Sequence, residues 1–309
     1  MPVLNWPTET ASAASEDTPR FVHAGSNICL DFHGDPGSAQ LVVFSDGNHH
    51  MALQEALSTF VIHNPAVEDI FYTTTPPRIA IQVLRKGRID IGNLRLSITP
   101  HVFISPPAVM EQLVAEKLLH QHQPFMRSRG VVLLVRKDNP QEIFSLKDLL
   151  RKDVKLFLSN PVSEKVSYQI YTDSLRRLAM LDGIKLEFLA HPPGKPNPDK
   201  LIYGESIHHR EAPQAVLDGR VDVALVFYHL ALRYQRIFPD LFDFAWPLGS
   251  LGREVCDINF FNYGLVGEGG EWGKSFVEFL KSDVVTEIYT AHGFDRALLC
   301  FHRVARHWT

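Results

Sequence analysis

The sequence predicts an α/β protein of two Rossmann-like lobes, with mixed, mostly parallel sheets joined by a two-segment hinge. A short module occurs twice, as Gly87-Arg88-Ile89-Asp90-Ile91 and as Gly219-Arg220-Val221-Asp222-Val223. Each copy follows a predicted helix opened by proline, Pro76-Pro77 in one case and Pro213 in the other, and leads into an apolar run. We therefore expect two similarly built lobes, which would bind a ligand near the carboxyl ends of their strands.

Length and composition support two soluble domains. A chain of 309 residues exceeds the size of a typical single core. It is 45% hydrophobic and 21% charged, and its formal net charge of −4 gives no general attraction to nucleic acid. We expect no nucleic-acid partner and a monomeric protein.

The first 37 residues are predicted to be a flexible leader. Residues 1–7 lack the basic and apolar regions of a secretory signal, so a cytoplasmic location stays open. No run of eighteen apolar residues predicts a transmembrane helix. Cys29, Cys256 and Cys300 are odd in number and widely spaced, which suggests no zinc site and leaves one disulfide possible.

The first lobe is predicted over residues 38–128 and 245–309. Its opening strand is a short apolar run, and Leu53, Ala56, Leu57, Phe60 and Val61 then form a helical stripe. Thr75 before the prolines predicts a capped helix start, and Gly87 predicts its end. The expected elements are a strand at 40–44, the striped helix, a strand at 67–72, a helix at 79–86, a strand at 89–94, a helix at 109–119, a strand at 259–266 and a long helical stretch at 273–292.

The second lobe is predicted over residues 129–244. A strongly apolar strand at 131–135 brings the chain into it, and the segment 241–247 returns the chain to the first lobe. These two crossings form the predicted hinge. Between them we expect a short helix at 146–150, a strand at 154–158, a helix at 166–181, a strand at 185–189 and the second copy of the module.

Signatures of catalysis are missing. The chain contains no GxSxG, HExxH, GxxxxGK[ST] or GxGxxG motif in a suitable context, so we expect neither an enzyme nor a cofactor. The pairs His49-His50 and His208-His209 could suggest metal binding, but adjacent histidines do not share a helix face. Asp90 and Asp222 are expected to fix local hydrogen bonds.

Several stretches together carry a family resemblance. The chain resembles the type II periplasmic solute-binding fold, most closely its molybdate/tungstate-binding branch, over roughly residues 40–296. The resemblance implies two lobes that close around one small inorganic ligand, a membrane transporter as partner and an extracytoplasmic location. The matching stretches are 41–45, 87–91, 131–140, 215–228, 276–282 and 292–294.

The resemblance also implies where an oxyanion would be held. Such proteins use hydroxyls in the first two strand-to-helix loops, backbone amides at two helix starts and a tyrosine after a strand. Here these positions fall near Ser45, at Thr74 or Thr75, within 160–168 and 210–212, and at Phe227 or Tyr228. We therefore expect the ligand-binding residues to be Ser45, Asp46, Asn48, Thr74, Thr75, Asn160, Ser163, Ser167, Glu211 and Tyr228.

One departure from the family pattern keeps alternatives open. The loop after Ser45 reads Asp46-Gly47-Asn48-His49-His50, and an acid there would repel a bare oxyanion unless it points away. A metal ion bound by His49 and His50 and a ligand with an amino group are therefore alternatives. The missing secretory signal keeps an enzyme on the same scaffold as a further alternative. Helix capping is the simpler explanation for Ser45 and for one of the threonines 73–75.

Overall fold

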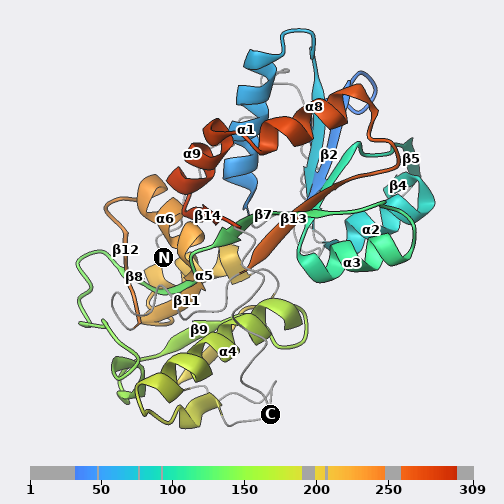
Figure 1. Cartoon of the computed structure of the whole chain (residues 1–309). Helices are drawn as coiled ribbons and strands as arrows, with labels where there is room; N and C mark the ends of the chain where they lie inside the picture. Colours follow the sequence, from blue (N-terminus) through green and yellow to red (C-terminus); the bar gives the residue numbers. More distant parts are fainter. Residues whose placement is uncertain are drawn as a thin grey trace. The chain divides into compact units, whose positions relative to one another are not determined.

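The computed structural model is an α/β fold of two compact units, as predicted (Figure 1). It describes residues 32–297, apart from 47–48, 76, 92, 190–198, 206–207 and 248–258. Among these, unit 1 comprises 128–259, and unit 2 comprises the residues before 128 and after 259. The chain thus passes between the units at 127/128 and at 259/260. The second lobe was predicted to end at residue 244, but the described residues 245–247 and 259 also belong to unit 1.

Unit 2 is built on a seven-stranded mixed sheet. Its centre is parallel, because β2 pairs in parallel with both β3 and β6, whereas β13 runs antiparallel to β6 and β7. The strands, in their order across the sheet, are β1 (Phe32–His33), β3 (Ile70–Thr74), β2 (Leu41–Ser45), β6 (Val102–Ser105), β13 (Phe260–Leu265), β7 (Gln123–Ser128) and β14 (Phe294–Arg296).

Helices contribute to an apolar core on each face of this sheet. The side chains of β2 alternate, so that Leu41 and Val43 join one core while Val42 and Phe44 join the other. Both faces are buried, which explains why β2 is a continuous apolar run. The first core includes residues of α1 (His50–His63), α8 (Gly270–Leu280) and α9 (Asp283–Ala291), and the second includes residues of α2 (Pro77–Lys86) and α3 (Pro107–Ala115).

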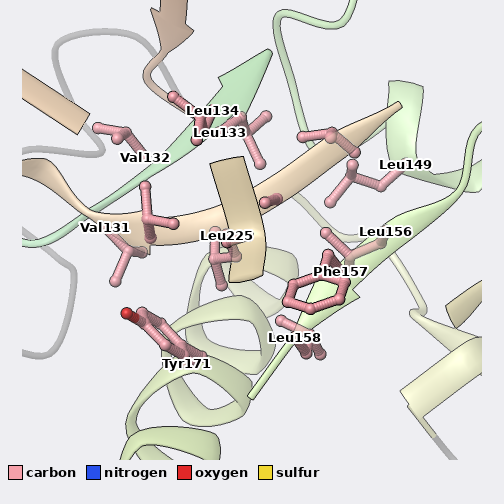
Figure 2. Packing of buried hydrophobic residues seen from close by; sticks show 14 of the residues in the cluster. Val131, Val132, Leu133, Leu134, Leu149, Leu156, Phe157, Leu158, Tyr171 and Leu225 are labelled. Carbon is pink, nitrogen blue, oxygen red and sulfur yellow. The ribbon is translucent and has the colours of Figure 1, made fainter. Parts of the chain in front are cut away.

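Unit 1 is built on a five-stranded sheet with its own core. Strand β9 pairs in parallel with β10 and β11, and β8 is antiparallel to β11 and β12. Figure 2 shows Leu133, Leu225 and Phe157, from three of these strands, in this core with Tyr171. The strands, in sheet order, are β10 (Leu201–Tyr203), β9 (Leu156–Leu158), β11 (Val223–Phe227), β8 (Val131–Arg136) and β12 (Phe242–Ala245).

The helices of unit 1 include α4 (Lys165–Leu181), α5 (His208–Leu217) and α6 (Tyr228–Ile237), with 3-10 segments at Asp148–Leu150 and Glu187–Leu189. Among the described helices of both units, none combines the length and the apolar composition needed to cross a membrane.

The third parallel strand of unit 2 was predicted wrongly. The segment expected as a strand at 89–94 divides into β4 (Arg88–Ile91) and β5 (Leu94–Ser97), which form a separate two-stranded antiparallel sheet. The two strands are close in sequence, so local hairpin pairing is satisfied first. The parallel strand beside β2 is instead β6, within a stretch for which no strand was predicted.

The flexible leader predicted for residues 1–37 is wrong at its end, because β1 is buried and pairs with β3, while residues 1–31 lie outside the described residues.

Three other predicted elements differ from the structure. Residues 187–189 form a 3-10 helix instead of part of a strand. Within the expected return crossing lies β12, which pairs with β8 and so completes the sheet of unit 1. The long final helix is two helices, because the Ser282 hydroxyl accepts a hydrogen bond from the Val285 amide and caps a new helix start.

The repeated module closes a helix in both units. Gly87 has φ +64° and Gly219 has φ +70°, the left-handed conformation that favours glycine at a helix end. Asp222 accepts a hydrogen bond from the Lys155 amide at 2.8 Å, and Asp90 accepts one from the Arg88 side chain at 2.9 Å. Both aspartates therefore fix local structure, as predicted.

The helix expected to open at Pro213 begins five residues earlier, at His208, so the proline lies inside α5. Proline has no amide hydrogen for the carbonyl four residues before it, which here belongs to His209. The buried Tyr234 hydroxyl of α6 donates to that carbonyl instead. A tertiary hydrogen bond thus allows proline within this helix.

We predict that Tyr234→Phe lowers the free energy of unfolding by about 1–3 kcal/mol, because it removes the donor to the His209 carbonyl. The measurement is urea denaturation of the single variant and of Tyr234→Phe combined with Pro213→Ala. Alanine restores an amide hydrogen at position 213, so the Tyr234 substitution should destabilise less in that background. An equal effect in both backgrounds would contradict this role for Tyr234.

Candidate functional site

Three neighbouring parallel strands of unit 2 end in hydroxyl residues. Ser45 ends β2 and lies opposite Thr74 of β3, and Ser105 ends β6 on the other side of β2. Thr75 follows β3 directly. Each of these four residues is at most 4% exposed. The structure therefore gathers Ser45, Thr74 and Thr75, as predicted, at one edge of the sheet, which we call the unit 2 edge.

Two hydroxyls at the unit 2 edge are buried without a hydrogen-bond partner among the described residues. They are Thr73 Oγ1 and Ser105 Oγ. Thr73 lies opposite Phe44, one position before the Ser45 and Thr74 pair, so side chains from both faces of the sheet meet this edge. A buried hydroxyl without a partner is unfavourable in the protein alone and is ready to bind a polar ligand.

Ser45 belongs to a buried chain of hydrogen bonds that reaches α9. Its Oγ lies 2.7 Å from His49 Nε2, and His49 Nδ1 lies 2.9 Å from the Tyr289 hydroxyl. The Ser45 hydroxyl also donates to the Asp46 carbonyl at 3.1 Å. Burial lowers the pKa of His49 to about 3, with a smaller contribution from His50, so the ring is neutral near pH 7.

The direction of this chain follows from Tyr289. Burial, and then the charge of Asp46, raise the pKa of the Tyr289 phenol, so it keeps its proton. We assign the phenol as donor to His49 Nδ1, which makes Nε2 the donor to Ser45. The Ser45 hydroxyl then offers a ligand a lone pair rather than a proton. Other hydroxyls at this edge, among them those of Thr73 and Ser105, can serve as donors.

The same contacts bear on the metal alternative. Both ring nitrogens of His49 are engaged, and His50 begins α1. Within the described ranges, no group of three or more His, Cys, Asp or Glu side chains could hold a metal ion. The described geometry thus gives no support to a metal site at His49 and His50.

Unit 1 has a comparable edge, where β9 and β10 end together. Ser159 follows β9, is fully buried, and its Oγ has no hydrogen-bond partner in the described part of the chain. Asn160 joins the strand ends, because its Nδ2 donates to the Gly204 carbonyl at 2.9 Å. Its Oδ1 accepts from the amides of Val162 and Ser163, at 2.8 and 3.1 Å. Asn160 therefore shapes the edge.

Near the start of α5, backbone amides donate hydrogen bonds to carboxylates of the chain itself. The His208 amide donates to Glu164 Oε2 at 2.9 Å, and the Glu205 amide donates to Glu211 Oε2 at 2.7 Å. The pKa of Glu164 is raised to about 7, mainly by burial and to a smaller extent by the charge of Glu211, although hydrogen bonds from the backbone at 208 and 160 lower it. Glu211 was predicted, and Glu164 was not.

His208 is the other buried polar group at this place. Its ring lies between Phe157 and Tyr171, with ring centroids 5.6 and 4.9 Å away. Its Nε2 has no hydrogen-bond partner among the described residues. Burial lowers the pKa of His208 to about 3, with a smaller effect from His209, so the ring is neutral. We use the name unit 1 edge for Ser159, Asn160, Glu164, His208 and Glu211.

The remaining predicted residues are more scattered. Ser163 is exposed, Ser167 lies half-buried in the first turn of α4, and Arg210 and Ala212 lie within α5. Tyr228 begins α6, where its half-buried ring packs on Phe244 and Trp246. Asn48, Cys29, Cys256 and Cys300 lie outside the described residues.

Ser105 and Ser159 were not predicted as site residues, although the sequence contains a signal for each. Ser105-Pro106-Pro107 repeats the pattern of Thr75-Pro76-Pro77, a hydroxyl followed by two prolines that lead into a helix. Ser159-Asn160 follows an apolar run, just as Ser45-Asp46 does. No comparable signal marks Tyr289, whose contact with His49 joins residues 240 positions apart.

We predict that His49→Gln lowers the stability of unit 2 at pH 7, because it breaks the links to Ser45 and Tyr289. The difference in the free energy of unfolding between the wild type and the variant should narrow by up to about 1.4 kcal/mol per pH unit below pH 6.5. The unfolded histidine binds a proton there, whereas the folded one stays neutral down to about pH 3.

Urea denaturation between pH 7 and 4 measures this gap. The control is His120→Gln, at a side chain that is 73% exposed, for which no such narrowing is expected. A gap for His49→Gln that stays constant over this range would show that the buried imidazole is not held neutral.

Comparison with solved structures shows the fold. The substrate binding protein of an ABC transporter from Agrobacterium tumefaciens is 13% identical, with a TM-score of 0.61, and the match covers 86% of this chain and 83% of that one. The sulfate-binding protein SubI from Mycobacterium tuberculosis is 14% identical, with a TM-score of 0.56, and the match covers 83% of this chain and 86% of that one. The periplasmic molybdate-binding protein from Azotobacter vinelandii is 14% identical, with a TM-score of 0.54, and the match covers 82% of this chain and 98% of that one.

Sequence comparison shows the family. No curated protein matches the chain. The model of one family, described as bacterial extracellular solute-binding protein, matches residues 41–295. This match includes most of both units and both edges, and it places the chain among solute-binding proteins rather than enzymes. The chain belongs to the bacterial extracellular solute-binding protein family.

Proposed function

We propose that this solute-binding protein binds a small oxyanion, of the molybdate, tungstate or sulfate kind, and passes it to a membrane transporter. In this proposal the ion is bound by buried polar groups at the ends of parallel strands.

The observation that carries the proposal is the set of buried hydroxyls at the strand ends that have no hydrogen-bond partner among the residues that the structure describes. Thr73 and Ser105 supply two in unit 2, and Ser159 supplies one in unit 1. Neutral hydroxyl donors can bind an anion, and charge-assisted hydrogen bonds of this kind are stronger than neutral ones. The names of the similar structures, which include a molybdate-binding and a sulfate-binding protein, agree with this class of ligand.

A second candidate is a small solute that carries an ammonium group. Buried Asp46 follows Ser45, and Glu164 lies at the unit 1 edge, so each unit has an acid near its strand ends. The lone pair that Ser45 offers would also accept a hydrogen bond from such a solute. Oxyanion binding is favoured because, within the described ranges, each unit has a buried hydroxyl without a partner that can donate.

Calorimetric titration of the purified protein tests the choice. The panel contains molybdate, tungstate, sulfate and phosphate, together with divalent cations and small amines. We expect binding of at least one oxyanion with one site per chain. Binding of amines alone would support the second candidate, and no heat with any oxyanion would refute the proposal.

We predict that Ser105→Ala weakens oxyanion binding by about 10- to 150-fold, because one hydrogen bond to a charged group is lost. The matched control is Ser174→Ala in α4, which removes another fully buried hydroxyl without a described partner, away from the strand ends. It should leave the Kd unchanged. Equal Kd values for the wild type and the Ser105 variant would contradict a binding role for Ser105.

A further inference from the structure

The start of α5 already holds a negative charge that belongs to the protein. The Glu164 carboxylate accepts the His208 amide at 2.9 Å, in the region where the family resemblance leads us to expect an anion. The Glu211 carboxylate accepts the Glu205 amide close by. An oxyanion that approaches the unit 1 edge therefore meets amides whose hydrogen bonds are used by the chain's own carboxylates.

Because this site is partly buried, a bound oxyanion would be strongly repelled by the negative charge of the Glu164 carboxylate. Glu164 is half-buried, and both Ser159 and His208 at the same edge are at most 2% exposed. Charges near one another repel more strongly when water is excluded from them. In the described part of the chain, the titratable groups coupled to Glu164 are Glu211 of α5 and Tyr171 of its own helix, while His208 contacts it through the backbone amide and has a neutral ring. None of the three supplies a positive charge near pH 7.

Protonation of Glu164 would remove the repulsion and supply a donor. The neutral carboxyl keeps an acceptor oxygen for the His208 amide, while its hydroxyl can donate to an anion. The carboxyl gains one proton from solvent when the ion binds and loses it on release. No covalent bond forms in this exchange.

We propose that the oxyanion is bound together with one proton, which is carried by the Glu164 carboxyl. This inference rests on the proposed function, and it makes Glu164 a residue that sets the strength and pH dependence of binding. Its pKa of about 7 in the free protein means that the proton must be taken up mainly above pH 7. Binding should therefore be strongest in mildly acidic solution.

The test is the Kd of sulfate, and of molybdate, measured by calorimetry at pH 6, 7, 8 and 8.5. Neither ion carries a proton in this range, so any linkage reports on the protein. For the wild type we expect a constant Kd below pH 7 and a rise of up to tenfold per pH unit above it. At pH 8, titration in two buffers of different ionisation enthalpy should show uptake of a proton.

Two variants separate the role of Glu164 from a structural one. Glu164→Gln keeps an acceptor for the His208 amide and removes the charge, so its Kd should be independent of pH and tighter than the wild-type Kd at pH 8. Glu211→Gln removes the neighbouring charge that raises the pKa of Glu164. Its Kd should begin to rise at a lower pH than in the wild type.

The control for net charge is Glu187→Gln, an exposed carboxylate of unit 1 that does not contribute to the pKa of Glu164. It should retain the wild-type pH profile. A wild-type Kd that does not change between pH 6 and 8.5 would overturn the proton uptake but leave oxyanion binding in place. Absence of binding at every pH, in both the wild type and Glu164→Gln, would overturn the proposed function and the inference with it.

Discussion

Parallel pairing of strands is the constraint on which the two candidate edges depend. In unit 2 the pairing of β2 with β3 and β6 brings Ser45, Thr74 and Ser105 to one edge. In unit 1 the pairing of β9 with β10 brings Ser159 and Gly204 together. Each strand is buried, so the polar group at its end must find a partner in the protein or in a ligand.

The two edges meet this requirement in different ways. Unit 2 satisfies Ser45 through a chain of hydrogen bonds to His49 and Tyr289, and it leaves Thr73 and Ser105 without partners among the described residues. Unit 1 satisfies backbone amides near the start of α5 with its own glutamates. The unit 2 edge therefore presents neutral hydroxyls, whereas the unit 1 edge presents a hydroxyl beside carboxyl groups.

Sequence periodicity was enough to predict the fold class and most central elements, because buried parallel strands are short apolar runs and amphipathic helices repeat every three to four residues. Periodicity failed where tertiary contacts determine which segments form strands and helices. Strand β6 was hidden in a loop rich in proline, and the Tyr234 hydroxyl lets Pro213 lie inside α5. Ser45 and Thr74 end neighbouring parallel strands and Thr75 follows directly, and their role in ligand binding stays a prediction. Glu164 and Tyr289 were missed because their roles arise from partners far away in the chain.

A crystal grown with molybdate tests most directly that buried hydroxyls at the strand ends bind the solute. Molybdenum gives an anomalous signal that locates the ion independently of the rest of the density. We predict one strong anomalous peak within hydrogen-bonding distance of the Ser105 hydroxyl at the unit 2 edge. A saturated crystal with its peak elsewhere, away from both edges, would contradict this assignment.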